Sequence, residues 1–148
     1  MCLLLETVAA FVGTVAFGIM FVVPAKQLLV CGLVGGSGWV VYAVTLERSS
    51  AAVASLAATI MIVLLARILA VVRKVPTNVI MIPGIFPIVP GIGLYDMIYN
   101  LMIGDTASGV SQGLAVLKSI GAIVFGIIAV FSLPNRWFRK RTKIMARR

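Results

Sequence analysis

The sequence predicts an all-α, polytopic membrane protein of about five transmembrane helices, with a fourth segment broken by proline and glycine. Of its 148 residues, 61% are hydrophobic, which is more than a soluble domain of this size can bury. The apolar residues also fall into segments of about 20 residues, the length that a helix needs to cross a bilayer. These segments cover 3–23, 28–46, 50–72, 78–103 and 109–133. They form one predicted transmembrane domain over 1–135, followed by a basic cytoplasmic tail over 136–148.

The first segment is predicted to be a span rather than a signal peptide. Met1 to Glu6 include no basic residue, and no small-residue cleavage site precedes Pro24. Cys2 and Cys31 lie in or beside apolar segments, where cysteine usually acts as a small buried hydrophobe. Because the sequence contains no histidine and no CxxC pair, we expect no zinc site, no histidine relay and no cofactor.

Basic residues give the predicted orientation. The formal net charge is +9, and seven lysines and arginines follow the last apolar segment. Such residues favour the cytoplasmic side and attract anionic lipid, at about 1 kcal/mol each. Five crossings then place ten basic residues inside and Arg48 alone outside, with Arg67 and Lys118 within spans. We expect a multi-pass inner-membrane protein with a cytoplasmic C-terminus, and no nucleic-acid partner because no recognition module accompanies the tail.

Three prolines and three glycines interrupt the fourth segment between Pro83 and Gly93. A proline removes a backbone donor and collides with the preceding turn, and unpaired carbonyls cannot face lipid. A broken helix exposes N–H groups that favour carboxylates and carbonyls that favour cations. We therefore predict a substrate-binding or gating site here, with these members: Pro83, Gly84, Pro87, Pro90, Gly91 and Gly93. The alternatives are a structural kink and, in a four-crossing topology, a re-entrant loop.

Polar residues within the apolar segments complete the predicted site. Asp96 and Asn100 are four residues apart and share a helix face. Asp96 lies about 12 Å before Gly104, and Lys118 about 13.5 Å into the fifth segment, so we expect them to interact. Arg67 is expected to face the opened backbone or to extend its side chain to the inner surface. For Lys118 the alternative is also extension to the membrane surface, and Glu6 is expected to be interfacial.

Small residues recur at helix-packing spacing along several predicted spans. The faces are Ala9/Gly13, Gly32/Gly36, Gly109/Gly113 and Ala51/Ser55/Thr59. Such faces permit close backbone contact, within the chain or against a second polypeptide. No GxSxG, HExxH or P-loop motif is present and only four carboxylates exist, so an enzyme is not expected.

The spacing of Pro83-Gly84, Pro90-Gly91-Ile92 and Gly104-Asp105 resembles the threonine/serine exporter family, specifically its small ThrE-type second domain, as in YjjB-like proteins. The resemblance implies half of a ten-helix exporter, with a YjjP-like membrane subunit as the other half. It implies export of threonine and serine, or of dicarboxylates such as succinate, driven by the proton-motive force. The Gly32/Gly36 and Gly109/Gly113 faces are the surfaces that we predict for the partner. A non-transporting scaffold subunit and a homo-oligomeric channel are the alternative functions.

Overall fold

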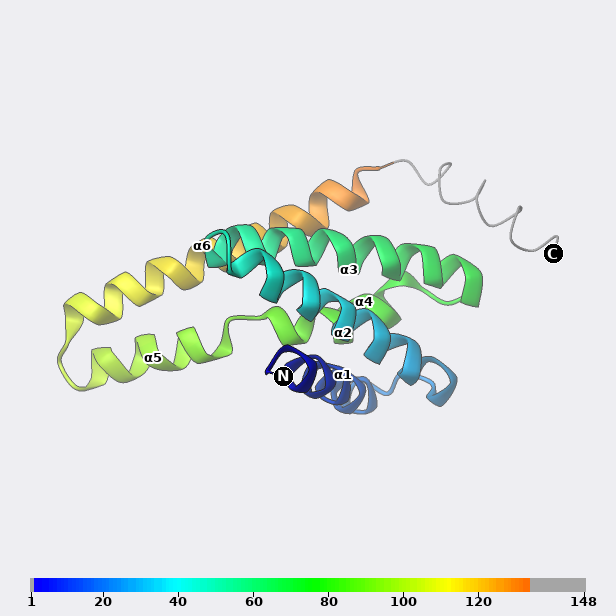
Figure 1. Ribbon diagram of the computed structural model, residues 1–148, viewed down its shortest axis with the longest axis horizontal. Helices are drawn as coiled ribbons and strands as arrows, with labels where there is room; N and C mark the ends of the chain where they lie inside the picture. The colour runs from blue at the N-terminus through cyan, green and yellow to red at the C-terminus, as the bar shows by residue number, and fades with distance from the viewer. Residues whose placement is uncertain (1, 134–148) are drawn as a thin grey trace.

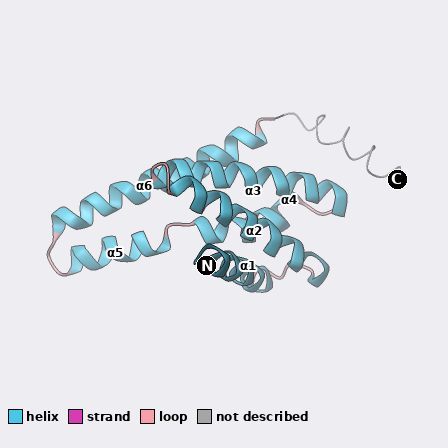
Figure 2. Ribbon diagram, viewed as in Figure 1, coloured by secondary structure: helices cyan, strands magenta, loops and turns pink. Residues whose placement is uncertain are grey.

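The computed structural model describes residues 2–133, and all the secondary structure in this range is helical (Figure 2). The helices are α1 Cys2–Met20, α2 Ala25–Leu46, α3 Ala51–Arg73, α4 Thr77–Ile85, the 3-10 helix η1 Phe86–Ile88, α5 Gly91–Met102 and α6 Thr106–Phe131. Four of them are long and apolar enough to cross a membrane. The fifth candidate is the pair formed by Thr77–Ile88 and Gly91–Met102, which are bent by 49°. The predicted fold class, including the broken fourth segment, is confirmed.

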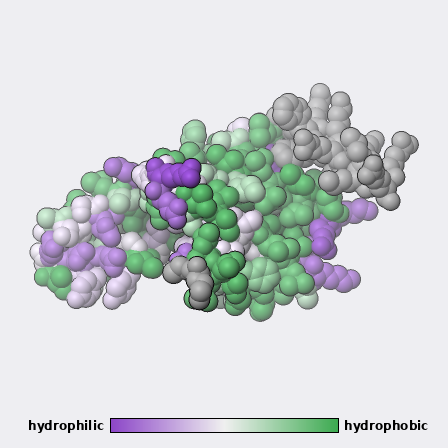
Figure 3. All heavy atoms as spheres, viewed as in Figure 1, coloured by the Kyte–Doolittle hydropathy of each residue, from purple (hydrophilic) through white to green (hydrophobic). Residues whose placement is uncertain are grey.

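The core of the protein lies where α2, α3 and α4 meet. Val34, Ile62 and Ile80 are fully buried and belong to one hydrophobic cluster. Helix α1 packs on α2, and α6 packs on α3 (Figure 1). We refer to α1 to α4 and the C-terminal half of α6 as the helical body. Its outer surface is apolar over a broad area, as Figure 3 shows for one face.

Two of the predicted small-residue faces are used inside the chain. A Cβ at Gly32 would lie 2.6 Å from the ring of Phe11 on α1, so α1 and α2 touch closely there. A Cβ at Gly109 would lie 2.8 Å from Leu101 on α5. These are the faces predicted to bind a partner subunit, and the structure corrects that prediction. The close approach of neighbouring helices already fills both.

Helix α5 and the first half of α6 form an arm that extends from the helical body (Figure 1). Among the described elements, α5 contacts α6 and no other helix. Helix α6 runs parallel to α3, and a Cβ at Gly126 would lie 3.1 Å from Thr59. Because the two helices run parallel and Gly126 lies beside Thr59, the residues eight positions earlier, Lys118 on α6 and Ala51 on α3, lie at the same level. Helix α3 begins at Ala51. The part of α6 before Lys118 therefore extends past the end of the helical body.

Charged residues gather at the two ends of the helical body. The α1–α2 and α3–α4 turns, which carry Lys26, Arg73 and Lys74, lie at the same end (Figures 1 and 3). The α2–α3 turn, with Arg48, lies at the other end. This is the arrangement that the predicted topology requires, while the side that faces the cytoplasm stays a prediction. The predicted tail over 136–148 lies outside the described residues.

Candidate functional site

The break begins at Pro83, which lies inside α4 and is almost fully buried. Proline has no backbone N–H, so the carbonyl of Val79, four residues earlier, lacks its helical donor. The Cys31 thiol on α2 donates a hydrogen bond to this Val79 oxygen, with the sulfur and oxygen atoms 3.5 Å apart. Sequence reasoning treated Cys31 as a small hydrophobe and missed this role. Because Val79 lies four residues before Pro83, the sequence already indicates that the Val79 carbonyl lacks a helical donor. Only the fold shows which group donates to it.

The chain then leaves helical geometry in two short steps. The Phe86 N–H donates to the Pro83 carbonyl, and the Val89 N–H donates to the Phe86 carbonyl at 3.2 Å. Pro90 then precedes Gly91, where α5 starts in a new direction. Local hydrogen bonds thus satisfy part of the opened backbone, as a membrane protein requires.

The glycines of the break have different surroundings. A Cβ at Gly84 would lie 3.2 Å from both Ile62 and Val34, so this residue lets α4 approach the core. A Cβ at Gly93 would lie 2.7 Å from Val116 of α6. Nothing lies within 4 Å of a Cβ at Gly91. The break is therefore closely packed at Gly84 and at Gly93, and it has open space at Gly91 between them.

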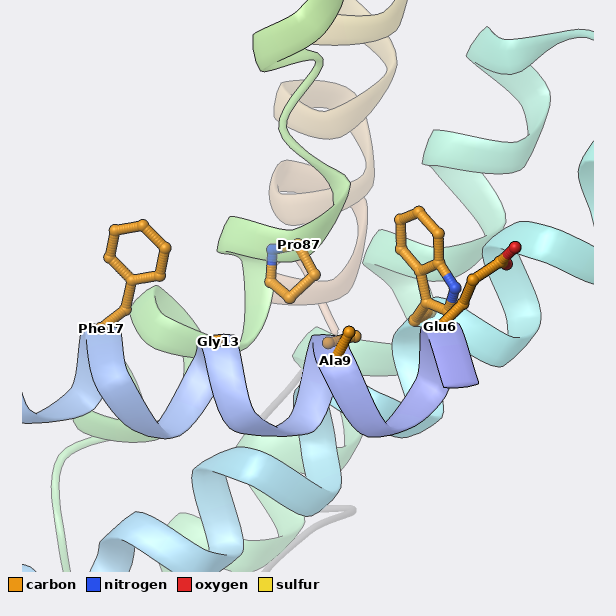
Figure 4. A pocket seen from close by; sticks show the side chains of 7 residues that line it. Glu6, Ala9, Gly13, Phe17 and Pro87 are labelled. Atoms are coloured by element: carbon orange, nitrogen blue, oxygen red, sulfur yellow. The ribbon is translucent and has the colours of Figure 1, made fainter. Parts of the chain in front are cut away.

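Two cavities adjoin the broken segment. The first, which we call the Glu6 cavity, has a volume of about 260 Å³ and includes Pro87 of η1 (Figure 4). The second, the Asn78 cavity, has a volume of about 230 Å³ and includes Pro83 of α4. The Glu6 cavity is lined by Glu6, Ala9, Ala10, Gly13, Phe17, Trp39 and Pro87. The Asn78 cavity is lined by Phe21, Val22, Val23, Pro24, Asn78, Val79, Ile82 and Pro83.

An aromatic cluster connects the walls of the two cavities. Phe86 of η1 stacks on Phe17, with ring centroids 3.9 Å apart, and contacts Phe21 at 5.5 Å. Phe17 lines the Glu6 cavity, and Phe21 lines the Asn78 cavity. The Phe86 ring thus lies on the break itself and packs against one residue from each cavity. Neither Phe17 nor Phe21 was a predicted site residue.

The Glu6 cavity carries two polar groups on largely apolar walls. Glu6, Gly13 and Phe17 lie along one side of α1, facing Pro87 (Figure 4). Trp39 of α2 contributes an indole whose Nε1 is buried and has no hydrogen-bond partner among the described residues. Glu6 was expected to be merely interfacial, and Trp39 was not singled out. A polar residue near the end of a span gives no sequence signal for a cavity.

Arg67 contacts the C-terminal end of α6. Its guanidinium donates hydrogen bonds to the carbonyls of Val130 and Leu133, the second at 3.1 Å. It also lies over the Phe131 ring, 5.4 Å from the centroid. A cation suits the negative end of a helix, where carbonyls lack intrahelical donors. The structure therefore assigns Arg67 to the C-terminal end of α6 and not to the opened backbone.

Asp96, Asn100 and Lys118 lie on the arm, and the predicted Asp96–Lys118 pair is not among the ion pairs of the described residues. A Cβ at Gly113 would lie 2.9 Å from Met97, which places Asp96 level with Leu114. Lys118 is then offset by one helical turn, about 6 Å, and its side chain is exposed. Counting residues from the ends of the segments missed this offset.

The turn between α5 and α6 is built from Gly104 and Asp105. Gly104 has φ +88°, a conformation that favours glycine. The Asp105 carboxylate accepts a hydrogen bond from the Ser108 N–H at 3.1 Å and caps α6. Hydrogen bonding from Ser108, first through its side chain and then through this N–H, lowers the pKa of the Asp105 carboxyl below its usual value. The last pair of the sequence motif thus forms the tip of the arm.

Several apolar helices and a Pro/Gly-broken segment define a multi-pass membrane protein. The family model for the threonine/serine exporter ThrE matches residues 6–133, and the chain belongs to this family. This is a family of transporters and not of enzymes. No curated protein and no solved structure was found to match the chain.

Proposed function

We propose that this chain is one membrane subunit of a secondary exporter for small carboxylate-bearing metabolites. Its cargo is threonine and serine or a dicarboxylate such as succinate, and the proton-motive force drives the export. Membership of the threonine/serine exporter family supports an export role. The observation that carries the proposal is the position of the broken segment: it lines two cavities and presents Phe86 to the aromatic residues of both.

In this proposal the aromatic cluster is the barrier between two half-paths. Broken helices in transporters commonly form a midplane site, and a rigid-body movement exposes it to each side in turn. Here η1 carries Phe86 between the helix ends of α4 and α5. A shift of η1 relative to α1 would separate Phe86 from Phe17 or from Phe21 and open one cavity at a time.

A second membrane subunit, of the YjjP-like kind, completes the proposed exporter. Among the described elements, helix α5 packs on α6 alone. Its other side is therefore uncovered, and the apolar residues Ile92 and Met102 are 81% and 83% exposed. Helix α1 also exposes a large apolar side, including Leu5, which is 76% exposed. These surfaces suit lipid or a partner helix, and they replace the two occupied glycine faces as proposed contact surfaces. We place the complex in the inner membrane, with the basic tail at anionic lipid on the cytoplasmic side.

The test is an export assay in cells that lack the chromosomal copy and carry Phe86→Ala. The truncated ring should remove the barrier, so that the threonine gradient across the membrane collapses while the complex still assembles. The matched control is Phe125→Ala, because Phe125 is 65% exposed on α6 and contacts neither cavity. Unchanged export in cells that carry Phe86→Ala would contradict the proposal that the aromatic cluster is the barrier.

The same cells separate the alternative functions. Joint loss of export and of complex assembly would favour a scaffold subunit. Ion conduction by the purified chain alone would favour a homo-oligomeric channel. Gly91→Leu is the better probe of the break itself, since its Cβ meets open space, whereas Gly84→Leu must also disturb Val34 and Ile62. Export lost in Gly91→Leu with normal assembly supports a transport role.

A further inference from the structure

We infer that the Asn78 cavity, together with the basic residues beside it, binds an anionic phospholipid. In this assignment the lipid phosphate meets Lys26, Arg73 and Lys74, and the adjoining part of an acyl chain enters the cavity. The inference goes beyond the proposed export function and does not depend on it. It also concerns a site separate from the predicted basic tail, which begins at residue 136.

The basic end of the helical body, which we define by Lys26, Arg73 and Lys74, has no carboxylate among the described residues to balance it. All three side chains are exposed, and none belongs to an ion pair in the described part of the chain. The sequence has four acidic residues in all. They lie on α1, at the opposite end of α2 and on the arm: Glu6, Glu47, Asp96 and Asp105. An anion that approaches the basic end therefore meets positive charge alone.

The basic residues flank the cavity. Lys26 lies two residues after Pro24 of the cavity wall, and Lys74 lies four residues before Asn78. The α1–α2 and α3–α4 turns that carry these cations lie at the same end of the helical body (Figures 1 and 3). A basic pocket between membrane helices is a common site for the headgroup of an anionic lipid.

The cavity changes from polar to apolar along α4. Asn78, in the first turn of α4, is the one polar side chain among the described lining residues. Ile82 and Pro83 line the cavity about one turn further on, roughly 6 Å farther from the basic end. Phe21 and Ile82 are 47% and 43% exposed, so the cavity opens on the outer surface of the helical body. A lipid with its phosphate near Lys74 and its chain toward Pro83 matches this gradient.

The apolar walls favour a lipid over a soluble phosphate compound. Burial of acyl methylene groups against these walls contributes favourably to binding, whereas a soluble phosphate has nothing to bury there. Pro83, where the break begins, and Phe21, which contacts Phe86, both belong to the wall. A bound lipid would thus lie against the break, in one half-path of the proposed exporter. Lipid and cargo would exclude each other from this cavity.

Native mass spectrometry of the purified full-length chain tests the site. The chain in detergent micelles is titrated with phosphatidylglycerol, with phosphatidylcholine or with glycerol 3-phosphate, which has the phosphate but no acyl chain. We expect phosphatidylglycerol to bind saturably. Phosphatidylcholine, which has no net charge, should bind about tenfold more weakly or less. Glycerol 3-phosphate should not displace the bound lipid.

Removal of the three cations tests the headgroup contact. Lys26→Gln, Arg73→Gln and Lys74→Gln in one chain should raise the Kd for phosphatidylglycerol about a hundredfold, because each cation beside a lipid phosphate contributes about fivefold. All three residues are exposed, so the variant should keep its helical content, which circular dichroism measures.

The controls separate this site from the tail and from general surface effects. Arg139→Gln, Lys140→Gln and Arg141→Gln in one chain remove the same charge from the tail and should leave most of the binding. Ile82→Trp keeps the cations but fills the apolar part of the cavity, so it should also weaken the binding of phosphatidylglycerol. Its control is Ile68→Trp, because Ile68 is 39% exposed on α3 and lines neither cavity.

Each outcome decides for or against the lipid site. Binding of phosphatidylglycerol that is lost in the basic-end variant and in Ile82→Trp, but kept in both controls, would uphold the inference. Equal Kd values for the two lipids, an equal loss in the tail variant, or normal binding by Ile82→Trp would overturn it. Displacement of the lipid by glycerol 3-phosphate would also overturn it and would indicate a site for soluble phosphate compounds.

Discussion

Replacing Cys31 by alanine tests how the break in α4 is held. In the wild type the Cys31 thiol donates to the Val79 carbonyl, which Pro83 leaves without a helical donor. Cys31 is fully buried, so water cannot take over this role without a change in packing. A buried polar group without a partner costs about 1–3 kcal/mol. We expect Cys31→Ala to lower the free energy of unfolding by about 2 kcal/mol, and Cys31→Ser, which keeps a donor, to cost less.

A double-mutant cycle isolates the hydrogen bond from the lost sulfur volume. Pro83→Ala restores a backbone N–H that can bond to the Val79 carbonyl within α4. The thiol then becomes redundant, so Cys31→Ala should cost about 1–2 kcal/mol less in the Pro83→Ala background. The measurement is denaturant unfolding in mixed micelles, followed by circular dichroism. An equal cost in both backgrounds would refute the role assigned to Cys31.

Three further predictions concern the ends of the helices. Arg67→Ala should lower the free energy of unfolding by about 3 kcal/mol or more, because it removes charged hydrogen bonds to the end of α6. Arg67→Lys should recover part of this loss. Denaturant unfolding in micelles measures both variants, and an unchanged midpoint for Arg67→Ala would contradict the capping role. Val22 is a β-branched residue at φ +56°, so Val22→Gly should raise stability by up to about 1 kcal/mol, and a loss of stability would argue against strain at the α1–α2 turn. The lowered pKa of the Asp105 carboxyl means that its stabilisation is complete above the unfolded pKa of about 3.9 and is lost as pH falls through the lower folded pKa. Asp105→Ala should therefore melt below the wild type at neutral pH, with a difference that shrinks in acid; a constant difference would exclude the carboxylate as its cause.

Some features of the site follow from local chemistry and could be read from the sequence. The break at Pro83 to Gly93 is one, because proline and glycine change backbone geometry wherever they stand. The turn at Gly104-Asp105 also depends on nearest neighbours alone. Partnerships across helices could not be read in this way. Arg67 meets the end of α6, and Cys31 meets Val79, because distant segments pack together.

The sequence by itself determined that this is a multi-pass helical membrane protein with an interrupted fourth segment, since hydropathy, length and proline content act locally. The tertiary structure decided what that segment adjoins. Helix register placed Asp96 and Lys118 on the arm, a turn apart, and brought Glu6 and Trp39 to one cavity beside Pro87. The register of two packed helices depends on how their side chains fit together. The spacing of the small residues in the sequence is compatible with several registers, and the packed structure has one of them.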